Sequence, residues 1–138
     1  MTTTSQPATP SEPAGAVGTA PQWLLDFYRC VDGRDVDGVV NGFAPDGTML
    51  FNAAPPLVGR VAIRGGVSWI YSSYQGMTHA FTNVWTIGDT TILEATVTYT
   101  CLDSRQVPVP TVTVLDRRDG LITCLRIFND MTLLAPPA

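Results

Sequence analysis

Four successive segments in the second half of the chain have the composition of β-strands, and they constrain the fold more than any other feature. Each is rich in Thr, Val and Ile, and they cover residues 78–87, 91–101, 107–115 and 121–131. The connections between them are short turns at Gly88-Asp89, Asp103-Ser104 and Asp119-Gly120. Because a parallel crossover needs about a dozen residues or more, these strands are predicted to form an antiparallel meander.

Helical patterns precede the meander. In the first helix, which Gly33 ends, apolar side chains recur every four positions: Trp23, Phe27 and Val31. Asp35 is a suitable N-cap for a second, short helix, and a turn at residues 44–47 stops that helix. The remaining elements are a short strand at residues 48–51 and a third helix at residues 60–74.

Helices followed by hairpins predict one α+β domain with its helices on one face of a curved sheet. We assign residues 22–134 to this domain, a length that can bury a core without disulfides or a metal. Residues 1–21 are mostly Thr, Ser, Pro, Ala and Gly, with Glu12 as the only charge. Such a segment buries too little apolar surface to offset its ordering entropy, so a disordered tail is expected there. Residues 135–138 are expected to be a short C-terminal tail.

Charge and residue usage exclude several kinds of function. The formal net charge is -4, and all eight basic residues are arginines without any basic cluster, so nucleic acid is not an expected partner. Lysine is absent, which excludes Schiff-base chemistry and a lysine-bound pyridoxal cofactor. The histidine and the three cysteines lack metal-ligand spacing, so neither a metal nor another cofactor is expected.

No segment has the pattern of a signal peptide or of a membrane span. The N-terminal residues lack both a basic region and an apolar run, and no later apolar run is long enough to cross a bilayer. We therefore expect a cytoplasmic protein without a membrane partner. Its cysteines are expected to be reduced: Cys30, Cys101 and Cys124.

Three stretches of the sequence resemble a known superfamily. They are VDGRDVDGVVNGFAPDGTM at residues 31–49, PPLVGRVAI at residues 55–63 and DGLITCLRIFNDMTLL at residues 119–134. The superfamily includes nuclear transport factor 2, SnoaL-like polyketide cyclases, ketosteroid isomerase, scytalone dehydratase and limonene epoxide hydrolase. The resemblance implies a cone-shaped, curved antiparallel sheet with three N-terminal helices that enclose a pocket.

The catalytic groups of these relatives fall mostly on other residue types here. The catalytic aspartate of ketosteroid isomerase corresponds to Phe51 or Asn52, and its oxyanion-hole tyrosine corresponds to Phe27. The second catalytic acid of limonene epoxide hydrolase corresponds to Ile127, whereas its water-holding asparagine is kept as Asn52. The resemblance therefore implies the fold and a pocket position for Asn52, without either complete mechanism.

His79 is the only histidine and lies near the start of the first predicted strand of the meander. Strand alternation places it on one face with Met77 and Phe81. An imidazole there either acts as a general acid or base near neutral pH, or bonds a backbone group at the mouth of the pocket. Tyr99 is expected on an apolar face, where its phenol either donates to a substrate carbonyl or packs in the core.

Two further polar residues are candidates, each with an alternative role. Asn52 either contacts the substrate or forms the turn after the first strand. Asp130 either pairs with Arg126 on the outer face of the sheet, or serves as a pocket acid whose pKa is raised by apolar surroundings. The candidate catalytic residues are therefore His79, Asn52, Tyr99 and Asp130.

Apolar and aromatic residues are expected to line the pocket and bind a small hydrophobic molecule: Phe27, Phe51, Tyr71, Tyr74, Phe81 and Ile127. Trp85 and the Thr/Val-rich strands predict an apolar outer sheet face and a homodimer through it.

Three functions agree with these patterns. The first is a cofactor-independent acid/base enzyme for a hydrophobic carbonyl, polyketide or terpenoid-like substrate, of the cyclase, isomerase or hydrolase type. The second is a non-catalytic protein that binds a small molecule. The third is a protein-interaction module.

Overall fold

The computed structural model describes residues 20–136. The disordered tail expected at residues 1–21 lies, apart from Ala20 and Pro21, outside the described residues. Three α-helices are present: α1 (Gln22–Asp32), α2 (Val36–Asn41) and α3 (Arg60–Ser73). The strands are β1 (Phe43–Phe51), β2 (Leu57–Val58), β3 (Tyr74–Ile87), β4 (Thr90–Cys101), β5 (Gln106–Arg118) and β6 (Leu121–Asn129), followed by a short 3-10 helix, η2 (Met131–Leu134).

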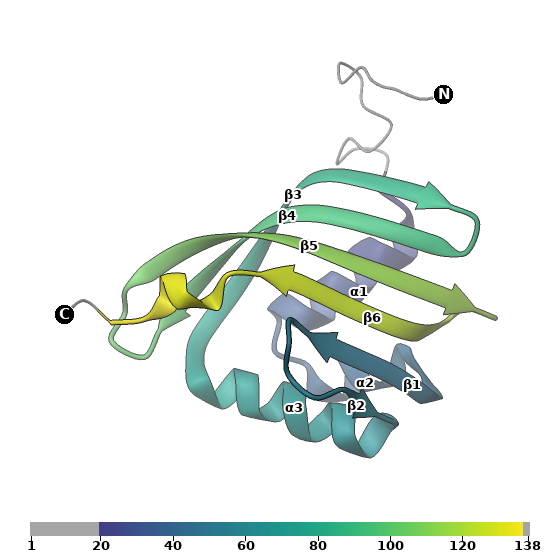
Figure 1. Cartoon of the computed structure of the whole chain (residues 1–138), viewed down its shortest axis with the longest axis horizontal. Helices are drawn as coiled ribbons and strands as arrows, with labels where there is room; N and C mark the ends of the chain where they lie inside the picture. The colour runs from purple at the N-terminus through teal and green to yellow at the C-terminus, as the bar shows by residue number, and fades with distance from the viewer. Residues whose placement is uncertain (1–19, 137–138) are drawn as a thin grey trace.

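The strands form one curved, unclosed sheet in the order β2-β1-β6-β5-β4-β3 (Figure 1). Strands β3 to β6 pair antiparallel with their neighbours in sequence, which confirms the predicted meander. The expectation of a wholly antiparallel sheet is wrong at one place, because β1 pairs with β6 in parallel. The long chain segment between these two strands permits this pairing, whereas the short hairpin turns would not.

Residues 44–47, predicted as a turn, belong to β1. Phe43 pairs with Ile122, but the next paired residue, Thr48, lies opposite Cys124, so the segment between them bulges out of the ladder. The Arg60 guanidinium donates to the Phe43 carbonyl oxygen at 3.0 Å. The bulge is thereby fixed to the start of α3.

The helices lie on one face of the sheet, and the core fills the space between them (Figure 1). Asp35 caps α2 as predicted, because its carboxylate accepts from the Gly38 N–H at 3.0 Å. Arg34, in the left-handed region with a φ of 59°, donates to the Tyr71 carbonyl oxygen at 2.7 Å. The α1–α2 connection is thus tied to the last turn of α3.

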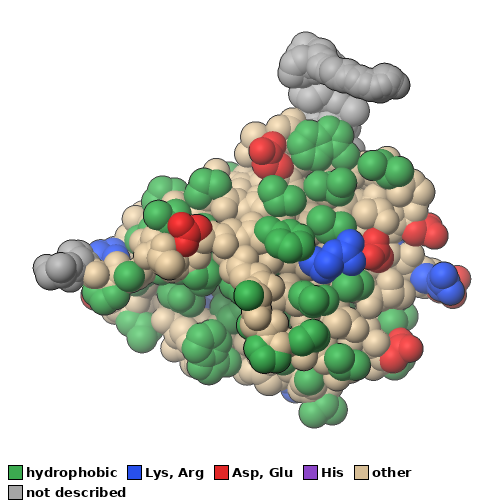
Figure 2. Space-filling view, viewed as in Figure 1, with side chains coloured by type: hydrophobic (Ala, Val, Ile, Leu, Met, Phe, Trp, Pro, Cys, Tyr) green, Lys and Arg blue, Asp and Glu red, His purple; other side chains and the backbone are tan. Residues whose placement is uncertain are grey.

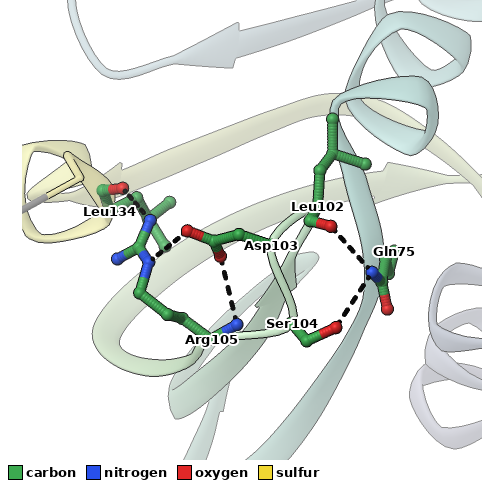
Figure 3. A network of polar contacts seen from close by, with 6 residues as sticks. All are labelled: Gln75, Leu102, Asp103, Ser104, Arg105 and Leu134. Atoms are coloured by element: carbon green, nitrogen blue, oxygen red, sulfur yellow. Dashed lines mark hydrogen bonds and ion pairs between the residues drawn. The ribbon is translucent and has the colours of Figure 1, made fainter.

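The turn between β4 and β5 is held by polar contacts (Figure 3). The Gln75 amide, at the start of β3, donates to the Leu102 carbonyl oxygen at 2.9 Å. Arg105 bonds the Asp103 carboxylate at 2.8 Å and the Leu134 carbonyl oxygen of η2 at 3.3 Å. The β4–β5 turn is therefore linked both to β3 and to η2.

No helix among residues 20–136 is both long and apolar enough to cross a membrane. In the same part of the chain, no group of three or more His, Cys, Asp or Glu side chains is arranged to hold a metal ion.

Candidate functional site

A cavity of about 70 Å³ lies between the helices and the concave face of the sheet. Its wall is mostly apolar and comes from all three α-helices and from β1, β3, β4, β5 and β6. The polar residues that line it are Tyr28, Tyr71, His79, Tyr99, Thr111 and Thr113. A few polar groups in an apolar pocket are the usual arrangement of a small-molecule site.

His79 lies on β3 next to Met77, with which it shares the inner face, and only 10% of its side chain is exposed. Its ring packs against the Tyr28 ring of α1, with 4.7 Å between the ring centroids. The Tyr28 ring also meets Phe81 edge-on. The imidazole is therefore held in a defined position at the wall of the cavity.

Asp32, the last residue of α1, binds His79 through both carboxylate oxygens. Oδ1 lies 2.6 Å from His79 Nδ1, and Oδ2 accepts from the His79 backbone N–H at 2.9 Å. Asp32 does not line the cavity. Its side chain is 27% exposed in a surface groove between α1 and β3, here called the outer groove, which His79 also borders. His79 thus separates the cavity from the carboxylate that holds it.

Asp32 is not among the residues predicted from the sequence, because its partner is 47 residues away. One signal was present. A carboxylate at the C-terminal end of a helix is disfavoured by the helix dipole, which carries partial negative charge there. An acid directly before the Gly33 that ends the helix therefore indicates a partner elsewhere in the fold.

The phenols and hydroxyls of the cavity are buried donors. Burial raises the pKa of Tyr99 to about 12, and the neighbouring Tyr74 phenol acts in the same direction. Burial also raises the pKa of Tyr28 above the usual value for tyrosine. Both phenols consequently keep their protons at neutral pH and can donate to a substrate oxygen.

Asn52 does not line the cavity. It has a φ of 52° and occupies the turn after β1, the alternative role considered for it. Its amide donates to the Asn129 side-chain oxygen at 2.7 Å and accepts from the Asn129 backbone N–H at 2.8 Å. Asn129 in turn donates to the Thr111 hydroxyl at 3.3 Å, so Asn52 reaches the cavity only through these two residues.

Both roles considered for Asp130 are wrong. Its carboxylate caps η2 by accepting from the Thr132 backbone N–H at 3.0 Å and from the Thr132 hydroxyl at 2.6 Å. These hydrogen bonds lower the pKa of Asp130, the opposite of the shift expected for a pocket acid. Arg126 pairs instead with Asp116 at 3.0 Å. Strand alternation misled the assignment because β6 ends at Asn129.

Four of the residues expected to bind substrate line the cavity: Phe27, Phe51, Tyr71 and Ile127. Tyr74 lies outside the lining and packs on the Tyr99 ring, with 5.0 Å between centroids. Phe81 borders the outer groove rather than the cavity.

Comparison with known proteins agrees with this architecture. The family model of the SnoaL-like domain matches residues 24–125. No curated protein matches the sequence. A solved structure of TerC, co-crystallised with polyporic acid, has 20% identity and a TM-score of 0.74, with 82% of this chain and 92% of that chain covered.

Two further solved structures are similar. A putative SnoaL-like polyketide cyclase from Jannaschia sp. CCS1 has 20% identity and a TM-score of 0.74, covering 84% of this chain and 92% of that one. SalBIII, an epoxide hydrolase/cyclase-like enzyme in pyran ring formation in the polyether salinomycin, has 20% identity and a TM-score of 0.72, covering 80% and 90%. At these identities the structures support the fold alone, whereas the family model spans most of the described chain. The chain therefore belongs to the SnoaL-like domain family.

Proposed function

We propose that the protein is an acid/base enzyme of the cyclase type that acts on a neutral, mostly apolar carbonyl compound. One observation carries the proposal. The imidazole of His79, held by Asp32, lies at the wall of a cavity that is otherwise apolar. Exclusion of water and a positioned proton acceptor are what proton abstraction from carbon requires.

The proposed reaction begins at a carbon next to the substrate carbonyl. His79 takes a proton from this carbon through Nε2, the ring nitrogen that Asp32 does not bind. The electron pair of the broken C–H bond forms the C=C bond of an enolate, the π pair of the carbonyl moves to its oxygen, and a buried hydroxyl such as that of Tyr99 donates to this oxygen. The resulting enolate carbon attacks a second carbonyl of the same molecule, and the proton returns from His79 to the new alkoxide. One C–C bond forms, the proton taken from carbon is returned to oxygen, and the substrate is neither oxidised nor reduced overall, so this scheme needs no redox cofactor.

The wall of the cavity defines the substrate class. No Arg lines the cavity within the described residues, so a carboxylate or phosphate would meet no permanent positive charge there. The volume of about 70 Å³ is smaller than the roughly 150 Å³ of an apolar protein cavity known to bind benzene. We expect the flexible side chains of Met49 and Met77, both in the wall, to move when a substrate enters.

Exchange of the α-protons of cyclopentanone in heavy water, followed by proton NMR, tests the proposal without knowledge of the natural substrate. Wild-type protein is expected to accelerate the exchange. His79→Gln should lower the rate by about a hundredfold or more, the usual loss for a positioned acid/base group. Asp130→Asn is the control and should keep the wild-type rate, because the Asp130 carboxylate caps η2 and does not line the cavity.

A protein that only binds small molecules is the second candidate, and the mostly apolar wall of the cavity favours it. Saturable binding of cyclopentanone without any exchange above the buffer rate would support this candidate and contradict the enzyme proposal.

A further inference from the structure

We infer that Asp32 is a positioning residue that fixes neutral His79 as the tautomer with its proton on Nδ1, which leaves Nε2 unprotonated toward the cavity. The functional consequence rests on the proposed acid/base role of His79. The tautomer itself is a property of the free protein, so it can be measured without any substrate.

Both carboxylate oxygens of Asp32 contact His79. Oδ2 accepts from the His79 backbone N–H, a group that can only donate. Oδ1 lies 2.6 Å from Nδ1, and an ionised carboxylate can only accept. Nδ1 must therefore supply the proton in this contact. In neutral imidazole the other nitrogen is then the proton acceptor.

The two arginines near Asp32 bind other groups. Arg29, which borders the same outer groove, pairs with Asp26 at 2.8 Å. Arg34 donates to the carbonyl oxygens of Tyr71 and Tyr74. Among the described residues, His79 is the hydrogen-bond partner of the Asp32 side chain.

The position of the His79 ring between the outer groove and the cavity indicates which ring edge borders the cavity. Asp32 borders the outer groove and not the cavity, whereas His79 borders both. The ring edge opposite Nδ1 therefore faces the cavity side. Packing against Tyr28 and the contact of Nδ1 with Asp32 Oδ1 oppose a ring flip, which would put the carbon Cδ2 in the place of Nδ1.

Asp32→Asn is expected to reverse the tautomer. The single amide oxygen of Asn must accept from the His79 backbone N–H, so its NH₂ group meets Nδ1. Because NH₂ only donates, Nδ1 becomes the acceptor and the ring proton moves to Nε2. The nitrogen that faces the cavity is then a donor and no longer a base.

The chain contains one histidine, so ¹⁵N-labelled histidine gives the signals of His79 alone. Spectra are recorded on the full chain at rising pH until they stop changing, which reports the neutral ring. We expect protonated Nδ1 and unprotonated Nε2 in the wild type, and the reverse in Asp32→Asn. Asp37→Asn removes the same charge from the neighbouring helix, where Asp37 pairs with Arg64, and should keep the wild-type tautomer.

A wild-type ring with its proton on Nε2 would overturn the inference, and so would an unchanged tautomer in a folded Asp32→Asn protein. The wild-type spectrum decides the matter alone if that variant does not fold. Cyclopentanone exchange should fall about a hundredfold or more in Asp32→Asn. If the wild type has the expected tautomer but does not accelerate exchange, the proposed function fails and the inference on Asp32 stands.

Discussion

Buried phenols determine how the protein responds to alkaline pH. Burial raises the pKa of Tyr71 and of Tyr99 to about 12, because a phenolate there would lose its hydration. In the unfolded chain a tyrosine titrates near a pKa of about 10. Above that pH the unfolded state releases these protons while the folded state retains them, so the equilibrium shifts toward unfolding.

We predict that the free energy of unfolding contributed by these phenols is fully present below about pH 10 and is lost as the pH rises through about 12. Urea unfolding at a series of pH values measures this. In Tyr99→Phe the free energy of unfolding should fall less steeply with pH above about 10 than in the wild type. Equal slopes in the two proteins would show that the Tyr99 phenol does not contribute.

The polar side chains illustrate what the sequence could predict. Tyr99 lies in β4 and His79 in β3 between its two irregular points, where alternation predicts the face of each residue, and both line the cavity. Asp130 follows the last strand residue, where alternation no longer applies. The contact between Asp32 and His79 joins a helix end to a strand, and no periodic pattern specifies such a contact.

The bulge of β1 depends on its connection to α3. The carbonyl oxygen of Phe43, a fully buried residue, accepts from the Arg60 guanidinium. Gly59, with a φ of 87°, also donates its backbone N–H to the Gly47 carbonyl oxygen at 2.7 Å. These contacts hold the bulge where the strand passes along the cavity.

We predict that Arg60→Met lowers the free energy of unfolding by about 1–3 kcal/mol, because it leaves a buried carbonyl without its donor. Arg64→Met, in the same helix, removes an exposed ion pair with Asp37 and should cost less than about 1 kcal/mol. Urea unfolding of both variants makes the comparison. Equal losses would mean that the contact with Phe43 does not stabilise the bulge.

The helices and the meander could be predicted from local patterns, and their order is as expected. The bulge could not, because Pro45 and Gly47 are equally typical of a turn. What distinguishes the two is pairing with β6, which lies more than seventy residues later in the chain. The same long-range pairing explains why the local patterns predicted a strand at residues 48–51 but not its parallel pairing with β6.

The outer face of the sheet exposes large apolar side chains. Val112 and Phe128 are direct partners across β5 and β6, and 37% and 50% of their surface is exposed. Trp85, on β3, is also 37% exposed. Figure 2 shows hydrophobic side chains distributed over this face, with few charges between them. Exposed apolar side chains on a sheet face, among them the neighbouring pair Val112 and Phe128, favour association.

We predict a homodimer through this face and a shift to monomer in Phe128→Asp, because a buried carboxylate would lack a partner there. Sedimentation velocity over a range of concentrations measures the change. Trp69→Asp is the control, since Trp69 is exposed on α3 and away from the sheet. A wild-type protein that sediments as a monomer at every concentration would contradict the prediction.

The identity of the catalytic base can be measured directly because His79 is the only histidine. The rate of cyclopentanone α-proton exchange and the ¹⁵N titration of His79 are recorded over the same pH range. If His79 is the base, the rate rises with pH, levels off, and has the same midpoint as the titration of the ring. The pH dependence should disappear in His79→Gln. A rate profile with a different midpoint, or one that His79→Gln retains, would contradict the assignment of His79 as the base.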